Sequence, residues 1–293
     1  MYNGILSLDH PLIAVADMQQ SKQVYEKLGF TIPPRGSHIE WGTGNWCIMF
    51  ANDYLELRGI LDPSRETLGL EHVLEQYGEG LAGIAFGTEG AEISHAKMSQ
   101  NQLHPKPVRY LTRNFEVPGQ WLQPKFALCF PADTETQGLT HVVLCDHLTP
   151  ELMRKPEYLH HDNDAQGIIS MTGVIDDIDQ VEQAQRRLLG PDAVQRVGEH
   201  LILTLATGQF IRLCTKDSLA EEYSGLSHKS IQQQSYLIAL KIAVGDIQKT
   251  KLSLEKNLIP YVQPNPYLVQ VADHYACGVV FEFEQRPTTH SSV

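Results

Sequence analysis

The chain has 293 residues, of which 42% are hydrophobic and 20% charged, and its formal net charge is −12. At roughly 150 residues per domain this length predicts two domains, and no run approaches the roughly 18 apolar residues that a membrane-spanning helix needs. The acidic balance and the scattered Lys and Arg residues argue against a nucleic-acid surface. The sequence begins without a signal-peptide pattern, so we expect a cytoplasmic protein without nucleic-acid or membrane partners.

The cysteines are odd in number, widely spaced and set in apolar runs such as FALCF and HVVLC. Buried free thiols fit this pattern better than disulfides or a thiolate metal site. The five positions are Cys47, Cys129, Cys145, Cys214 and Cys277.

The first structural unit lies in residues 8–30, LDHPLIAVADMQQSKQVYEKLGF. LIAVA is an apolar, strand-like run, and Asp17 follows it as a good helix N-cap. Apolar residues then recur at helical spacing as far as Gly29, a residue typical of helix ends. The unit is therefore a strand followed by a capped amphipathic helix.

The same unit recurs three more times along the chain. AVGDIQKTKLSLEKN repeats AVADMQQSKQVYEKL closely, and two further copies are weaker. The copies occupy residues 80–103, 169–190 and 243–257, with Glu89, Asp177 and Asp246 in the place of Asp17. Three short strand-like runs follow each copy, so the chain contains four βαβββ modules.

The modules divide the chain into two halves. They lie at about residues 5–60, 80–148, 167–216 and 235–286. We expect a first domain at 1–150, a solvated connector at 151–166 that is rich in Pro, His and Asp, and a second domain at 167–293.

Four tandem βαβββ modules resemble the vicinal oxygen chelate (VOC) superfamily. Within it, the runs LDHPLIAVAD, RGSHIEWGTGNWCIMF, YLEL and CDHLTPEL are similar to a glyoxalase-like family over about residues 5–175. The resemblance implies an α+β fold in which paired modules close into two cupped barrels. In outline it extends to about residue 285.

The superfamily also implies a divalent metal held by the first and last strands of each module. His10 and Glu56 take these positions in the first module. In the second module the positions fall on Ala82 and Leu144, which cannot bind a metal, although His147 lies just beyond. The resemblance therefore implies His10, Glu56 and His147 as ligands of Zn, Fe, Mn or Ni. The second half lacks such ligands and is expected to be a degenerate copy.

The segment SHIEWGTGN is too polar and glycine-rich for a simple core strand. It is either a hairpin tip or a loop whose His38 and Asn45 contact a substrate, with Trp41 and Trp46 as walls of an apolar pocket. Glu56 is the candidate catalytic base. For His10, the roles of metal ligand, substrate contact and core residue all stay open.

Two classes of function fit these residues. One is a VOC enzyme of the lyase, isomerase or dioxygenase type that acts on a small oxygen-rich substrate, with or without a divalent metal. The other is a non-catalytic small-molecule binding protein of the bleomycin-resistance type, which the missing ligand at Ala82 supports. Because four modules allow two cups within one chain, a monomer and a homodimer both remain open.

Overall fold

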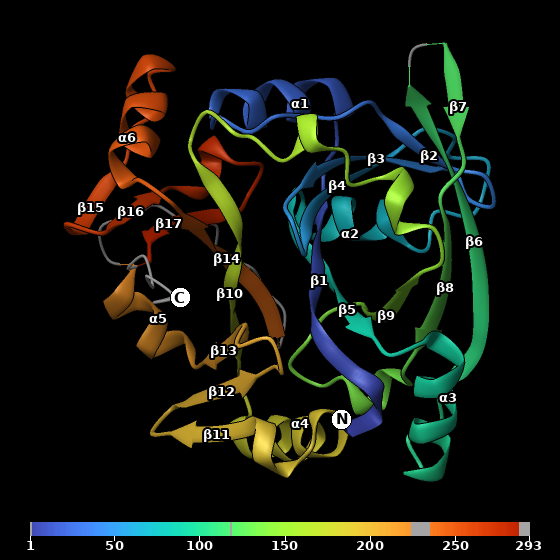
Figure 1. Cartoon of the computed structure of the whole chain (residues 1–293). Helices are drawn as coiled ribbons and strands as arrows, with labels where there is room; N and C mark the ends of the chain where they lie inside the picture. The colour runs from blue at the N-terminus through green and yellow to red at the C-terminus, as the bar shows by residue number, and fades with distance from the viewer. Residues whose placement is uncertain (1, 118, 224–234, 287–293) are drawn as a thin grey trace, which may run out of the picture.

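A computed structural model describes residues 2–117, 119–223 and 235–286, which form two β-sheets with helices at their edges (Figure 1). The first sheet has nine strands in the order β2-β3-β4-β1-β5-β9-β8-β6-β7, and a further pairing of β2 with β6 closes it into a barrel. Its strands are β1 (Ile5–Ala14), β2 (Gly36–His38), β3 (Thr43–Met49), β4 (Tyr54–Ile60), β5 (Gly80–Thr88), β6 (Lys106–Val117), β7 (Gln120–Leu122), β8 (Lys125–Phe130) and β9 (Val142–His147).

The second sheet repeats this arrangement with eight strands in the order β11-β12-β13-β10-β14-β17-β16-β15. No pairing between its outer strands is seen in the described ranges, so this sheet is an open cup. Its strands are β10 (Ala165–Ile175), β11 (Val194–Val197), β12 (His200–Thr204), β13 (Phe210–Cys214), β14 (Ser235–Val244), β15 (Val262–Asn265), β16 (Leu268–Val271) and β17 (Val280–Gln285). The end of the predicted second domain, residues 287–293, lies outside the described residues.

Each half contains two βαβββ modules, which confirms the predicted α+β fold. In each half the first strands of the two modules pair antiparallel, β1 with β5 and β10 with β14. Each first strand also pairs parallel with the last strand of its own module. The helices are α1 (Met18–Lys27), α2 (Leu70–Tyr77), α3 (Ala91–Gln100), α4 (Ile178–Leu189), α5 (Lys216–Glu222) and α6 (Ile247–Lys256). Among the described residues no helix is long and apolar enough to span a membrane.

Aspartate caps start three of the four repeated helices, as the sequence predicts. The carboxylates of Asp17, Asp177 and Asp246 each accept at least one backbone N–H from the first helical turn. The fourth prediction is wrong, because the N-cap residue of α3 is a glycine without a side-chain cap. Glu89 instead pairs with Lys97 at 2.7 Å.

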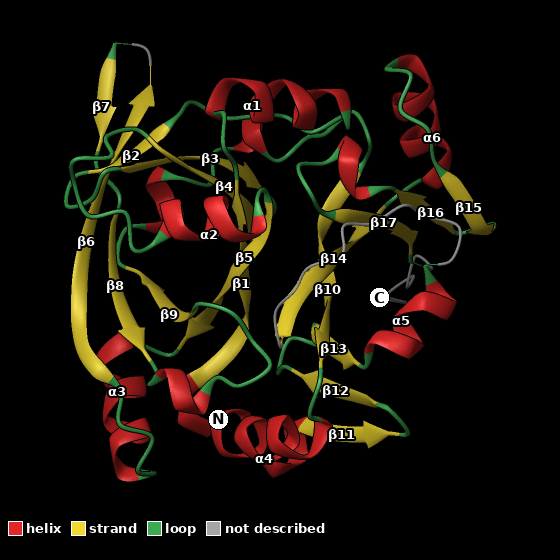
Figure 2. Ribbon diagram, turned by 180° about the vertical axis from the view of Figure 1, so that it is seen from behind, coloured by secondary structure: helices red, strands yellow, loops and turns green. Residues whose placement is uncertain are grey.

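The two sheets share one hydrophobic core. Figure 2 shows β5 and β1 of the barrel facing β14 and β10 of the second sheet. The core cluster joins both halves, with Phe30 of the first half 5.8 Å from Phe281 of the second between ring centroids. Tyr25 meets Phe281 edge to face at 5.7 Å. The halves are therefore packed through apolar side chains.

The connector between the halves is solvated only in part: residues such as Glu157 and His160 are exposed, while Met153 and Asn163 are buried and His161 contacts the barrel. His161 accepts the Thr31 backbone N–H at Nδ1, 3.0 Å away, and its Nε2 donates to the carbonyl of Met49 at 3.0 Å. Asn163 is fully buried and donates to the Leu28 carbonyl at 2.9 Å. These bonds satisfy backbone groups that would otherwise be buried unpaired.

The predicted state of the cysteines is confirmed, since all five are free and buried.

Candidate active site

A cavity of about 110 Å³ lies inside the first barrel. Most of its polar lining comes from strands β1, β2, β4 and β6, and its apolar lining comes from β1, β5, β6, β8, β9, helix α2 and the loop after β2. The polar residues are His10, His38, Tyr54, Glu56, Arg58, Thr67, Arg113 and His141, and the apolar ones include Trp41, Leu111, Phe126, Leu128 and Phe130. Three of the polar residues alternate along β4, because every second side chain of a strand faces the same side.

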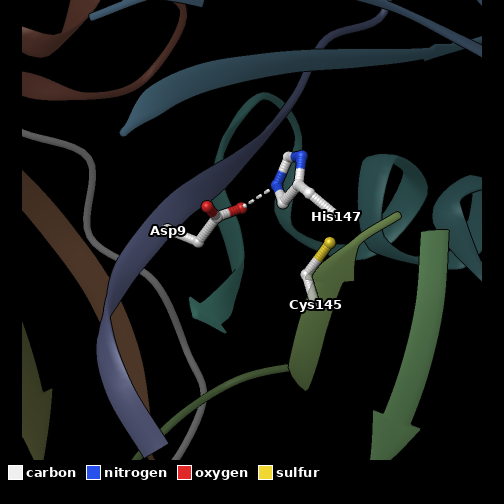
Figure 3. Close-up of side chains that lie close together, drawn as sticks. All are labelled: Asp9, Cys145 and His147. Atoms are coloured by element: carbon white, nitrogen blue, oxygen red, sulfur yellow. Dashed lines mark hydrogen bonds and ion pairs between the residues drawn. The ribbon is translucent and has the colours of Figure 1, made fainter. Parts of the chain in front are cut away.

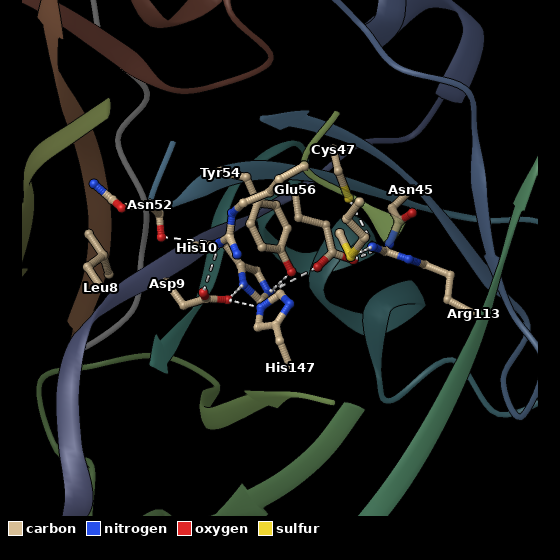
Figure 4. Close-up of polar contacts among 12 residues, drawn as sticks. Leu8, Asp9, His10, Asn45, Cys47, Asn52, Tyr54, Glu56, Arg113 and His147 are labelled. Atoms are coloured by element: carbon tan, nitrogen blue, oxygen red, sulfur yellow. Dashed lines mark hydrogen bonds and ion pairs between the residues drawn. The ribbon is translucent and has the colours of Figure 1, made fainter. Parts of the chain in front are cut away.

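A β-bulge in β1 brings two neighbouring side chains together. In a regular strand Asp9 and His10 would point to opposite faces of the sheet, but the register with β5 shifts between Leu8 and His10. Asp9 Oδ2 lies 2.7 Å from His10 Nδ1 and 2.9 Å from His147 Nε2 (Figure 4). The Asp9 carboxylate therefore joins the two imidazoles.

The second ring nitrogen of His10 faces the carboxylate of Glu56. Nε2 lies 3.2 Å from Glu56 Oε2 and 3.4 Å from the hydroxyl of Tyr54, on which the imidazole is stacked. The other carboxylate oxygen of Glu56 accepts a hydrogen bond from Asn45 Nδ2 at 2.8 Å. Both oxygens of Glu56 are thus held in place by neighbouring side chains (Figure 4).

The electrostatics of these groups follow from burial and hydrogen bonding. Burial alone would raise the pKa of Glu56, but the hydrogen bond from His10 and the positive charges of His10 and Arg58 hold it below its usual value. Burial would lower the pKa of His10, but Asp9 and Glu56 raise it. The pairing therefore favours the charged forms of both groups, the carboxylate of Glu56 and the imidazolium of His10, against the cost of burial.

His38 differs from His10 because its imidazole is neutral. Burial, with the nearby charge of Arg58, lowers its pKa to about 3. Nδ1 lies 3.1 Å from the carbonyl of Thr43, to which it donates, so Nε2 carries the lone pair. This Nε2 lies 3.4 Å from Asn45 Nδ2 and 3.9 Å from Glu56 Oε1.

A possible metal-binding cluster lies next to this centre. The potential donor atoms of Asp9, Cys145 and His147 all lie within 4.8 Å of one another (Figure 3). Over the described part of the chain, this is the one group of three or more His, Cys, Asp or Glu side chains with that spacing. Burial raises the pKa of the Cys145 thiol well above its usual value, so metal binding there would first have to remove its proton.

The predicted site residues are distributed over three places. His10, His38, Trp41 and Glu56 line the cavity, and Asn45 lies behind Glu56. Trp46 faces away from the cavity, where its Nε1 donates to the Met18 carbonyl of α1 at 2.7 Å. His147 lies beside Asp9, not beside Glu56. Their functional roles stay predictions.

The strand registers identify the counterpart of Glu56 in the second module. Glu56 of β4 lies opposite Leu12 of β1, and Val142 of β9 lies opposite Ile84 of β5. Leu12 lines the cavity, whereas Ile84, Val142 and Leu144 pack in the core cluster on the other face of the sheet. The residue of β5 that packs on the cavity side beside β9 is Ala85, opposite Val143, so Val143 takes the place of Glu56. Counting along the repeat alone selects Leu144, because it does not include the register shifts between β1 and β5.

The cavity is therefore asymmetric between the two modules. Ala82, which the repeat aligns with His10, and Val143, which takes the place of Glu56, both line it, and neither carries a donor atom. The polar side chains at the first-strand and last-strand positions, His10 and Glu56, therefore both come from the first module.

Several residues of the site were not predicted from the sequence. Tyr54 and Arg58 stand two residues either side of Glu56, so strand alternation could have found them. Asp9 could not be found in this way, because its side chain reaches His10 only through the bulge. Arg113 comes from the irregular second module, whose strands are the hardest to assign.

Comparisons with known proteins agree with this fold. The model of the glyoxalase-like domain family matches residues 8–189, and no curated protein matches the sequence. A hypothetical protein from Staphylococcus aureus has a similar structure, with a TM-score of 0.69 at 14% identity over 96% of this chain and 100% of that one.

Two further structures resemble the whole chain. One is a mutant of 4-hydroxymandelate synthase from Streptomyces coelicolor, with a TM-score of 0.57 at 12% identity over 97% of this chain and 93% of that one. The other is a xylose isomerase-like TIM barrel/4-hydroxyphenylpyruvate dioxygenase fusion protein, with a TM-score of 0.58 at 13% identity over 100% of this chain and 50% of that one. At such identities these likenesses describe the fold. With the family match covering more than half of its length, the chain belongs to the glyoxalase-like domain family of the VOC superfamily.

Proposed function

We propose that the first barrel is the active site of a VOC enzyme that acts on a small, oxygen-rich substrate. One observation carries the proposal: His10 Nε2 and Glu56 Oε2 meet at 3.2 Å on the cavity wall. Burying a carboxylate and an imidazole is unfavourable unless both are paired and hydrogen-bonded, as they are here. Such an arrangement is typical of a catalytic centre rather than a simple core.

The residues move and hold protons in distinct ways. Glu56 is ionised and faces the cavity, so it is the candidate base for a proton beside a substrate oxygen. Asn45 fixes the orientation of its carboxylate, and His10 can return the proton. Asp9 holds Nδ1 of His10, which directs Nε2 to the reacting side.

A divalent metal fits the same pair of residues. His10 and Glu56 would hold it, because a carboxylate oxygen and an imidazole nitrogen that has lost its proton are ligands that Zn, Fe, Mn and Ni accept. Asp9 on the far nitrogen of His10 is the hydrogen-bonded carboxylate that metal-ligating histidines usually have. When bound, such an ion polarises paired substrate oxygens and stabilises the anion that develops.

The predicted third ligand, His147, belongs to the neighbouring Asp9–Cys145–His147 cluster. We infer that His10 and Glu56 form the reactive pair and that His147 acts on it through Asp9. Ala82 and Val143 also line the cavity and offer no ligand, so His10 and Glu56 would be the residues that hold an ion there.

Turnover assays test this function. Purified protein supplied with one divalent metal at a time is assayed against catechols for oxygen uptake, and against hemithioacetals for isomerisation. Turnover by the wild type that Glu56→Gln lowers by about 10²-fold or more would support the proposal, because such a loss is typical of a removed catalytic base. Turnover that Glu56→Gln leaves unchanged would contradict it.

The alternative is a protein that binds a small molecule without chemistry. Ala82 and Val143 favour it, because the second module offers no ligand at the positions that correspond to His10 and Glu56. Tight ligand binding by metal-free protein, together with no turnover in either assay, would support this alternative.

A further inference from the structure

Two arginines of the cavity have no carboxylate partner among the described residues. Arg113 of β6 is 2% exposed. Its Nη1 donates to the sulfur of Cys47 at 3.0 Å and its Nη2 to the sulfur of Met153 at 2.9 Å. Burial raises the pKa of Cys47 to about 12, so both of these partners are neutral. The Nε of Arg113 is buried without a hydrogen-bond partner.

Arg58 of β4 is in a similar position. Its closest polar contact is a long one, 3.5 Å from Nη2 to the hydroxyl of Thr43, and its Nε is also buried without a partner. Its guanidinium lies 5.5 Å from the ring centroid of Trp41. The indole Nε1 of Trp41 is a third donor without a partner, on a residue that is 4% exposed.

These three side chains all line the cavity of the first barrel. The negative charge of Glu56 favours the charged form of both guanidinium groups, but its two oxygens are held by Asn45 and His10, and it forms no ion pair with either arginine. Both arginine charges help to lower the pKa of His38, after the larger effect of burial, so they act on the same part of the cavity.

Two other arginines of the first half, by contrast, are paired with acids. Arg35 pairs with Glu116 at 2.8 Å, and Arg109 pairs with Glu66 at 3.3 Å. A buried guanidinium without an anion is strongly unfavourable for folding. Two of them around one cavity, with the indole donor, form a site whose missing component is an anion that accepts several hydrogen bonds.

We propose that Arg58, Arg113 and the indole N–H of Trp41 bind the carboxylate of an anionic substrate, whose apolar part packs against Leu111, Phe126 and Leu128. This inference deepens the proposed function, because it names the substrate class of that cavity: a small carboxylic acid with an apolar body. Bidentate pairing with planar guanidinium groups makes a carboxylate a better fit than a neutral amide of the same shape.

Titration calorimetry on metal-free protein tests the proposal with benzoate and benzamide as probes. They have nearly the same shape and differ in charge. We expect the wild type to bind benzoate at least about tenfold more tightly, which is about 1.4 kcal/mol. Arg58→Gln, Arg113→Gln and Trp41→Phe should each reduce this preference.

Arg109→Gln is the matched control, because Arg109 lies on the same strand as Arg113 and contacts the Trp41 ring at 5.2 Å, yet it is exposed and paired with Glu66. It should keep the full preference. The proposal would be overturned if the wild type bound the two probes equally or bound neither. It would also be overturned if Arg109→Gln lost as much of the preference as the variants of Arg58, Arg113 and Trp41. If Arg113→Gln does not fold, the variants at Arg58 and Trp41 still decide. Because the assay needs neither metal nor turnover, its result is independent of the catalytic proposal.

Discussion

The contact between the two halves contains a carboxyl group whose ionisation is unfavourable in the folded protein. Asp53 is 5% exposed and accepts the backbone N–H of Ile168 at 3.1 Å and the side-chain amide of Gln209 at 2.9 Å. Burial raises its pKa from 3.8 to about 7. Asp53→Asn keeps an acceptor for Ile168 and removes the charge.

The effect of this substitution on stability depends on pH. Between the unfolded pKa and about 7, the unfolded chain loses its proton while the folded one keeps it, so this group lowers stability as pH rises. The shift corresponds to about 4 kcal/mol at about 1.4 kcal/mol per pKa unit. The loss of stability is complete above pH 7, and it is absent below pH 4. The free energy of unfolding of Asp53→Asn, relative to that of the wild type, should therefore rise by about 3 kcal/mol from pH 4.5 to pH 8.

Urea unfolding followed by circular dichroism at pH 4.5, 6 and 8 measures this difference. A matched comparison of wild type and variant cancels the other titrating groups, such as Asp9, whose lowered pKa acts at lower pH. A stability difference that stayed constant within about 0.5 kcal/mol over this range would refute the reasoning, because additive mutational effects agree to about that margin.

Two further predictions concern packing and thiol chemistry. Gly29 has φ 89°, and a methyl group there would overlap Ser253 and Asn163, so Gly29→Ala should lower the stability measured by thermal unfolding by roughly 2 to 4 kcal/mol. Gly69 has φ 77° with open space around it, so Gly69→Ala should lower the stability by only about 1 kcal/mol. Equal losses in the two variants would show that the two halves are not packed against each other at Gly29. All five cysteines are buried, so Ellman's reagent should label none of them quickly in the folded protein and five after unfolding; rapid labelling of the folded protein would contradict the burial.

The sequence predicts the fold well because the repeat is local. An N-cap aspartate such as Asp17 and the helical spacing after it are properties of adjacent residues, and three of the four copies carry them. The copy at Glu89 fails because a glycine takes the cap position in α3. Local signals thus identify the modules even at low similarity between copies.

The site is harder to predict, because it depends on register and on irregular backbone. Counting along the repeat selects Leu144 as the counterpart of Glu56, but Leu144 packs in the core, and Val143, opposite Ala85, is on the cavity side. The bulge that joins Asp9 to His10 adds a residue that strand alternation would exclude. His147, the last residue of β9, contacts Asp9 of β1, and this contact depends on how the strands are arranged in the barrel.

Metal content is the measurement that tests the central claim, the pairing of His10 with Glu56, most directly. Wild type, His10→Ala, Glu56→Gln and Cys145→Ser are loaded with Zn, dialysed and analysed for bound metal, with thermal unfolding of the metal-free proteins as the check on folding. We expect about one equivalent in the wild type and in Cys145→Ser, and none in His10→Ala or Glu56→Gln. No metal in the wild type, or loss in Cys145→Ser with retention in Glu56→Gln, would contradict the account.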